Sequence, residues 1–237
     1  MATKEVAKMA KITLKSKDRK YLQRFERLLQ SLEAGTFRSL NIGFRKLYND
    51  LINSDDFKIT PKKFAPVAER IQKAIEDSEG RAWLWTIKNN KLPDVEQTTA
   101  GVYAKQRTKD ITKGIIATTN KDFERLVSKV NSIKDITEKQ KKAMLKKAVK
   151  RRAGIRADTI TRTEVHRGVT KTQSNIAKEI GGDIYKVWIA VNDERTRDDH
   201  ADADGQRVRH DKLFTVGGEK LDEPNQINCR CAMGIDF

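Results

Sequence analysis

The stretch that decides the fold of this chain is Tyr185-Lys186-Val187-Trp188-Ile189-Ala190-Val191. It is rich in β-branched and aromatic residues and alternates in character, which predicts a β-strand with one face in the core. Directly before it, Gly181-Gly182 closes a segment whose apolar residues recur at helical spacing, as glycine does beyond a helix C-terminus. A helix that gives way to a strand within a few residues predicts an α+β module.

More strands are expected beyond this stretch. The segments with strand character are Gln206–Arg209, Leu213–Val216 and Ala232–Phe237, and Gly217-Gly218 is typical of a turn. Upstream, the capping-box spacing of Thr161 and Glu164 favours a helix start, and Arg162 is placed for a local salt bridge with Glu164. We therefore expect residues 155–237 to form a module of one helix, or a broken helix, followed by a short antiparallel sheet.

The first 150 or so residues predict helices. Their apolar side chains recur at helical spacing in two clear groups: Phe25, Leu28, Leu29 and Leu32, then Leu40, Phe44, Leu47, Tyr48 and Leu51. Thr60-Pro61 and Thr137-x-x-Gln140 are typical helix starts, and Gly154 indicates a break. The predicted fold class is thus α+β: a mainly helical N-terminal region at 1–154, either a bundle or an extended arm, followed by the small module.

Positive charge is concentrated in that helical region. The chain has 237 residues and a net charge of +16. Residues 1–156 hold 37 Lys and Arg against 18 Asp and Glu, whereas residues 157–237 hold 12 against 15. This asymmetry favours a region that contacts a polyanion, joined to a nearly neutral folded module.

The strongest run of charge is residues 139–156, with nine basic residues and no acidic one. Its candidate DNA-backbone contacts are Lys139, Lys141, Lys142, Lys146, Lys147, Lys150, Arg151 and Arg152, beside a weak apolar stripe of Ala143, Met144, Ala148 and Val149. Two interpretations stay open: a helix that contacts nucleic-acid phosphates, or the solvated face of a linker helix. No aromatic residue interrupts the run, so any binding should be independent of sequence.

Several classes of protein are disfavoured by composition. Two cysteines do not make a secreted disulfide framework. The first twenty residues have scattered lysines and no apolar core of a signal peptide, and no apolar run reaches the roughly 18 residues that span a bilayer. We expect a chain that is made in the cytoplasm and has no membrane partner.

Cys229-Arg230-Cys231 is the candidate metal site. In an extended segment the two thiols lie on one side, where they suit zinc if His200 approaches as a third ligand and Asp193, His166 or Asp204 as a fourth. The spacing is not that of a zinc finger, so two small buried residues with no metal are the other interpretation. A metal-dependent nuclease built on His200, Cys229 and Cys231 is the alternative function. No cofactor and no enzymatic activity are expected.

The loop before His200 predicts a structural role. It packs Asp193, Arg195 and Arg197 with further acidic residues, and such groups interlock as bidentate pairs. No nucleophile or phosphate-binding loop accompanies them, so we expect these charges to hold the loop in shape.

These residues, in this order, resemble one known family. The matching positions are Arg162, Glu164, Trp188, Asp193, Arg195, Arg197, His200, Gly205, Asn228, Cys229, Arg230 and Cys231. Residues 155–237 are similar to the phage Mu F-like domain, which defines a family of phage head morphogenesis, or minor head, proteins. The helix start departs modestly from the family pattern, reading Thr-Arg-Thr-Glu-Val at 161–165.

The resemblance implies a minor capsid protein of a tailed phage. Such a protein is assembled in the host cytoplasm into the head interior, in few copies, and commonly with the portal protein. The major capsid or scaffolding protein is a further expected partner. The basic helices are then expected to contact packaged double-stranded DNA, with a role in packaging or ejection.

Overall fold

A computed structural model describes residues 2–54, 57–93 and 101–236, with side-chain environments from Arg19 onward. Contacts divide the chain into two compact units. The sheet unit consists of Met1–Leu32, Ser78–Gln97 and His166–Phe237, and the helical unit of Glu33–Asp77 and Thr98–Val165. The predicted boundary near residue 154 does not coincide with this division, because each unit combines segments that are distant in sequence. The predicted α+β class is confirmed.

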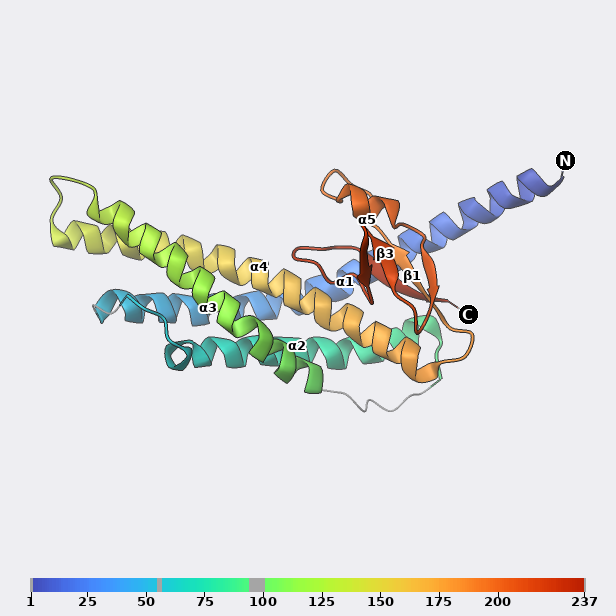
Figure 1. Ribbon diagram of the computed structural model, residues 1–237, viewed down its shortest axis with the longest axis horizontal. Coiled ribbons are helices and arrows are strands. Elements are labelled where there is room, and N and C mark those ends of the chain that lie inside the picture. Colours follow the sequence, from blue (N-terminus) through green and yellow to red (C-terminus); the bar gives the residue numbers. More distant parts are fainter. Residues whose placement is uncertain (1, 55–56, 94–100, 237) are drawn as a thin grey trace. The chain divides into compact units, whose positions relative to one another are not determined.

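Four helices precede the first strand (Figure 1): α1 (Ala2–Asn53), α2 (Pro61–Asn90), α3 (Val102–Asn131) and α4 (Glu138–Ile180). Two of the predicted starts are confirmed. Thr60 Oγ1 accepts from the Lys63 amide at 3.3 Å just before α2. At α4, Gln140 Oε1 accepts from the Thr137 amide at 2.7 Å, and Thr137 Oγ1 accepts from the Gln140 amide at 3.3 Å. Among the described residues, no helix is both long and apolar enough to cross a bilayer.

The helical unit packs parts of all four helices around one apolar core. Leu40 and Phe44 of α1, Phe64 of α2, Phe123 of α3 and Val149 of α4 are all almost fully buried there. Of the two predicted arrangements, bundle or extended arm, these segments therefore form a bundle. At the edge of this apolar core, ion pairs join α3 to α4, and one of them is Arg156 with Asp122 at 2.8 Å.

Helix α4 corrects three expectations. It runs through Gly154 without a break, and Thr161 and Glu164 lie inside it rather than at a helix start. Its buried stripe continues at helical spacing past Gly154 as far as the residue before Thr161: Leu145, Val149, Ala153, Ala157 and Ile160. Burial of this stripe outweighs the roughly 1 kcal/mol cost of one glycine. The predicted stripe was wrong in part, since Ala143 and Met144 are exposed.

The sheet unit is organised by β1 (Tyr185–Ile189), the central strand of an antiparallel sheet of order β2-β1-β5. β2 spans Arg207–Arg209 and β5 spans Ala232–Asp236. Trp188 is opposite Met233, and Tyr185 is opposite both Arg209 and Asp236. The strands predicted at 185–191, 206–209 and 213–216 are confirmed, each shorter by one or two residues. The strand predicted at 232–237 is confirmed over Ala232–Asp236, and Phe237 lies outside the described residues.

A hairpin of β3 (Phe214–Val216) and β4 (Glu219–Leu221) packs on the short helix α5 (Asp198–Asp202). Gly217 and Gly218 form its turn with φ of 56° and 84°, which favours glycine. A Cβ on Gly217 would lie 2.8 Å from Asp199 Oδ2, so the hairpin also needs this glycine for its close approach to α5. The predicted turn is confirmed.

The N-terminal helix is part of the sheet unit through Tyr21. Its hydroxyl donates to the Met233 carbonyl of β5 at 2.9 Å and accepts from Gln173 Nε2 of α4 at 2.7 Å. Tyr21 and Phe25 also pack edge-on against Trp85 of α2. The sheet therefore folds against residues more than 140 positions earlier in the chain.

Candidate metal centre and the segment that presents it

The last stretch before β5, residues 222–231, is held along α4. Thr170 Oγ1 donates to the Pro224 carbonyl at 3.0 Å, and Arg167 donates to the Asn225 carbonyl. His166 Nε2 lies 2.8 Å from the Cys231 carbonyl oxygen. These contacts come from successive turns of one helix face, so α4 fixes where both cysteines lie.

Asn228 sets the direction of the first cysteine. Its φ is 56°, a left-handed conformation that asparagine tolerates better than most residues. The Cys229 amide then donates to the Gln226 carbonyl at 3.1 Å, which closes a tight turn. A local backbone requirement therefore accounts for asparagine at this position.

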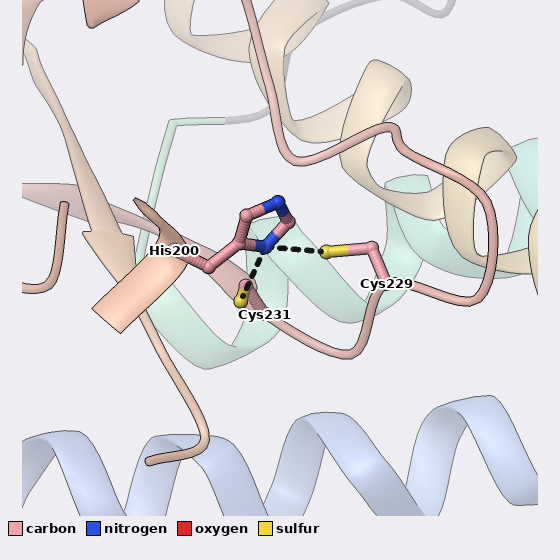
Figure 2. Close-up of side chains that lie close together, drawn as sticks. All are labelled: His200, Cys229 and Cys231. Carbon is pink, nitrogen blue, oxygen red and sulfur yellow. Dashed lines mark hydrogen bonds between the residues drawn. The ribbon is translucent and has the colours of Figure 1, made fainter. Parts of the chain in front are cut away.

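His200 of α5 meets both cysteines in the interior (Figure 2). Its Nδ1 lies 3.4 Å from Cys231 Sγ and 3.5 Å from Cys229 Sγ. All three side chains are buried. On the other side of the ring, Nε2 lies 2.8 Å from Gln226 Oε1. Trp188 packs edge-on against the imidazole at 5.3 Å between ring centroids.

The cluster favours separated charge. The hydrogen bond from the Cys231 thiol lowers the pKa of Cys229 to about 4, and the same contact raises the pKa of Cys231. The hydrogen bond with Cys229 also raises the pKa of His200. These contacts therefore favour the thiolate form of Cys229, beside the His200 imidazole.

The structure does not place Asp193 with the other three predicted metal residues. Its carboxylate contacts Arg230 at 2.5 Å, and it accepts from the Arg195 amide at 3.0 Å and from Thr196 Oγ1 at 3.2 Å. The hydrogen bond from Arg230 holds the pKa of Asp193 well below its usual range. Asp193 thus organises the loop and ties it to the residue between the two cysteines.

The predicted structural role of the loop agrees with its contacts. Arg197 donates to the Ile227 carbonyl at 2.8 Å. Gly205 has φ of 77° and its amide donates to the Trp188 carbonyl at 2.8 Å, a conformation that favours glycine. Asp204 accepts from the Ala190 amide at 2.8 Å. Arg195 lines a small cavity at the cysteines with Arg197, Thr196 and Asn228.

Two other predicted residues have partners that the sequence did not indicate. Arg162 pairs with Asp158 one turn earlier on α4 at 3.1 Å, not with Glu164. Glu164 is buried and accepts a bidentate pair from Arg107 of α3, at 2.8 and 2.9 Å. The Arg107 guanidinium lowers the pKa of Glu164, but burial has the larger effect and raises it. Glu164 therefore braces the helical unit.

Most of the basic side chains in residues 139–152 are exposed to solvent. Of the candidate DNA-backbone contacts, the exposed ones are Lys139, Lys142, Lys146, Lys147, Lys150, Arg151 and Arg152. Lys141 is half-buried and pairs with Glu138 at 2.6 Å. Both interpretations of the run require solvent exposure, so this placement is compatible with each of them.

Sequence reasoning missed Gln226 and the contact of His166 with the Cys231 carbonyl. Gln226 stands two residues before Asn228, in a segment with no periodicity. His166 falls in a helical segment, where a buried polar side chain gives no distinct pattern. Both act through contacts between segments 26 or more residues apart, so no local signal could have revealed them.

The basic helical unit and the sheet unit, whose Asn-Cys-Arg-Cys turn faces the histidine loop, lie in part within the region that one family shares with this chain. The chain belongs to the family described as Phage Mu protein F like protein, whose pattern matches residues 108–234, more than half of the chain. This membership confirms the resemblance and supports a phage head morphogenesis protein and component of the virion. The matched region begins in α3, well before the expected residue 155.

One curated relative is an NAD(+)--arginine ADP-ribosyltransferase EFV of Enterococcus faecalis (strain ATCC 700802 / V583). The two are 37% identical over 82 residues, which cover 30% of this chain and 17% of the relative. The chain thus spans less than a fifth of that protein's length. No solved structure matches the chain.

Proposed function

We propose that this chain is a minor capsid protein in the head interior of a tailed phage, associated with the portal protein and in contact with packaged DNA. Family membership supports the head assignment. The observation that supports DNA contact is the exposed basic surface of α4, which has at least seven unburied cationic side chains over four turns. A scaffolding or major capsid protein is a further partner in this proposal.

The basic surface suits contact with the phosphate backbone of DNA, which does not depend on base sequence. Lys142, Lys146 and Lys150 recur every fourth residue, so they follow one side of α4. Each lysine that neutralises a phosphate releases counterions, which makes affinity fall steeply with salt. The side chains buried beneath them, Leu145 and Val149, anchor the helix in its core.

The test is binding to labelled duplexes of unrelated sequence over a salt series. We expect equal affinities for the duplexes, and a variant with Lys146→Ala, Lys147→Ala and Lys150→Ala should lower the slope of log K against log salt by about 2 to 3. A matched control removes three exposed lysines from α3: Lys105, Lys109 and Lys113. An equal loss in both variants would mean that overall charge, and not α4, determines binding.

Portal association calls for a separate measurement. The chain is co-expressed with the portal protein of its own phage and recovered by a tag, with and without nuclease treatment. If the portal protein is still recovered after nuclease treatment, the two proteins contact each other directly. If it is no longer recovered, they were held together only by binding the same DNA. For the head interior, the chain should resist added protease in intact particles and be cut once the particles are opened.

We further propose a structural rather than an enzymatic role. The carboxylates of Asp193 and Asp204, which flank His200 in the sequence, accept from Arg230 and from the Ala190 amide. The alternative, a metal-dependent nuclease, predicts plasmid cleavage with Mg²⁺, Mn²⁺ or Zn²⁺ that is lost in His200→Ala. Cleavage with that dependence would overturn the structural assignment.

A further inference from the structure

The spacing of three ligand atoms matches a tetrahedral zinc centre. Zn–S bonds of about 2.3 Å and Zn–N bonds of about 2.0–2.1 Å place nitrogen and sulfur ligands roughly 3.6 Å apart. The His200 Nδ1 atom lies 3.4 Å from one sulfur and 3.5 Å from the other. All three ligand atoms lie within 4.8 Å of one another. An ion fits between them with only small side-chain adjustments.

The histidine is oriented as a metal ligand. Gln226 Oε1 lies 2.8 Å from Nε2 and is placed to accept an N–H from it. In that tautomer the lone pair of Nδ1 is directed at the sulfurs, and Figure 2 shows Nδ1 facing both of them. Metal-binding histidines commonly donate their other ring nitrogen to an oxygen in this way. Trp188 packs edge-on against the ring, and the His200 side chain is buried.

We propose that His200 Nδ1 and the sulfurs of Cys229 and Cys231 bind one zinc ion, with water as the fourth ligand. Two thiolates and one imidazole form a soft donor set that suits zinc and does not suit Mg²⁺ or Ca²⁺. The water comes from the cavity of about 20 Å³ that these three residues line with Arg195, Arg197 and Asn228. That volume holds a single water molecule.

The ion would join α5 to the segment before β5, in addition to the contact of Arg197 with the Ile227 carbonyl. His200 belongs to α5, whereas both cysteines precede β5, about 30 residues later. The pair of Arg230 and Asp193 closes the same junction from its exposed side. Zinc is thus a crosslink within the module, and the proposal is independent of DNA or portal binding.

The test uses the purified, reduced full chain, freed of metal by a chelator. Zinc titration should give one ion per chain, and Co²⁺ should produce the strong near-ultraviolet absorption of thiolate ligation. Cys229→Ser, Cys231→Ser and His200→Gln should each weaken binding at least tenfold. His210→Gln is the matched control, because His210 follows β2 outside the cluster, and its zinc binding should equal that of the unaltered chain.

A second measurement covers variants that fail to fold. Zinc at 100 times its dissociation constant should raise the thermal midpoint of the unaltered chain by about 5–10 °C. Magnesium at the same concentration should not shift it. A folded, reduced chain that retains no zinc, gives no cobalt absorption and shows no midpoint shift would overturn the proposal. So would a Cys229–Cys231 disulfide in protein isolated under reducing conditions.

Discussion

The ammonium nitrogen of Lys186 lies 2.5 Å from Asp222 Oδ1 and 3.0 Å from the Asp222 carbonyl oxygen, with the Lys186 side chain fully buried. Lys186 is on β1, the central strand, where an apolar residue would be expected. Burial lowers its pKa, although the hydrogen bond with Asp222 opposes this shift. Phe214 also lies beneath the ammonium group, 5.6 Å from ring centroid to nitrogen. One carboxylate therefore makes a buried charge tolerable at the centre of the sheet.

Removal of Asp222 should destabilise the sheet unit strongly. Asp222→Ala leaves Lys186 buried without its carboxylate, which we expect to cost about 3–5 kcal/mol of unfolding free energy. The measurement is urea denaturation followed by tryptophan fluorescence. As a control, the double variant Lys186→Met with Asp222→Asn should recover most of the loss, because no buried charge remains. A double variant as unstable as Asp222→Ala would show that the buried charge is not the cause.

Acid should weaken the fold through the same carboxylate. Burial raises the pKa of Asp222, but the hydrogen bonds from Lys178 and Lys186 outweigh it and bring the pKa far below its ordinary value. A folded pKa below the unfolded one, about 3.9, gives stability that is present above that value and lost as the pH falls through it. We expect unfolding free energy to drop between about pH 5 and pH 2.

Asp222→Asn isolates this contribution. Burial raises the pKa of the neighbouring Glu223, which acts in the opposite direction, so the two chains must be compared over the same pH series. The variant should lose less stability on acidification than the unaltered chain. Equal slopes for both chains would rule Asp222 out as the source.

Gly154→Ala should stabilise the protein. Gly154 lies inside α4, and nothing lies within 4 Å of a Cβ built there. Alanine should add about 0.5–1 kcal/mol, or about 1–4 °C in the thermal midpoint. Gly114→Ala in α3, equally open, should give a similar gain. If Gly154→Ala lowers the thermal midpoint and Gly114→Ala does not, α4 needs the flexibility of glycine at residue 154.

The hairpin turn offers a pair of substitutions one residue apart. Gly217→Ala combines left-handed strain with a contact of 2.8 Å to Asp199, whereas a Cβ on Gly218 meets nothing within 4 Å. We expect a loss of about 1–2 kcal/mol for Gly218→Ala from strain alone, and about 1–3 kcal/mol more for Gly217→Ala. Calorimetry of both variants checks the difference. Equal losses would mean that the hairpin moves away from α5 without cost.

The elements that the sequence predicted well are those set by local chemistry. Thr60-Pro61, the capping box at Thr137, Gly181-Gly182 and the turn at Gly217 all fix backbone conformation within a few residues. His200, Cys229 and Cys231 were also grouped correctly, because alternation in an extended segment places both thiols together.

The errors arise where distant contacts override a local signal. Thr161 and Glu164 have capping-box spacing, yet Arg107 takes the Glu164 carboxylate from another helix 57 residues away. Asp193 was expected at the metal and instead binds Arg230, which sequence spacing cannot reveal. Gly154 was predicted to be a break, but the buried stripe on both sides of it keeps α4 continuous.

The contact between Tyr21 and Met233 has a consequence for synthesis on the ribosome. The two residues are 212 positions apart, so α1 must wait for β5 before the Tyr21 hydroxyl can donate to the Met233 carbonyl. Contacts of such high sequence separation slow folding and leave apolar surface uncovered meanwhile. A fragment that starts at residue 155 would lack Tyr21, Phe25 and Trp85 altogether. The apolar surface of the sheet unit is therefore fully covered only after β5 has been synthesised.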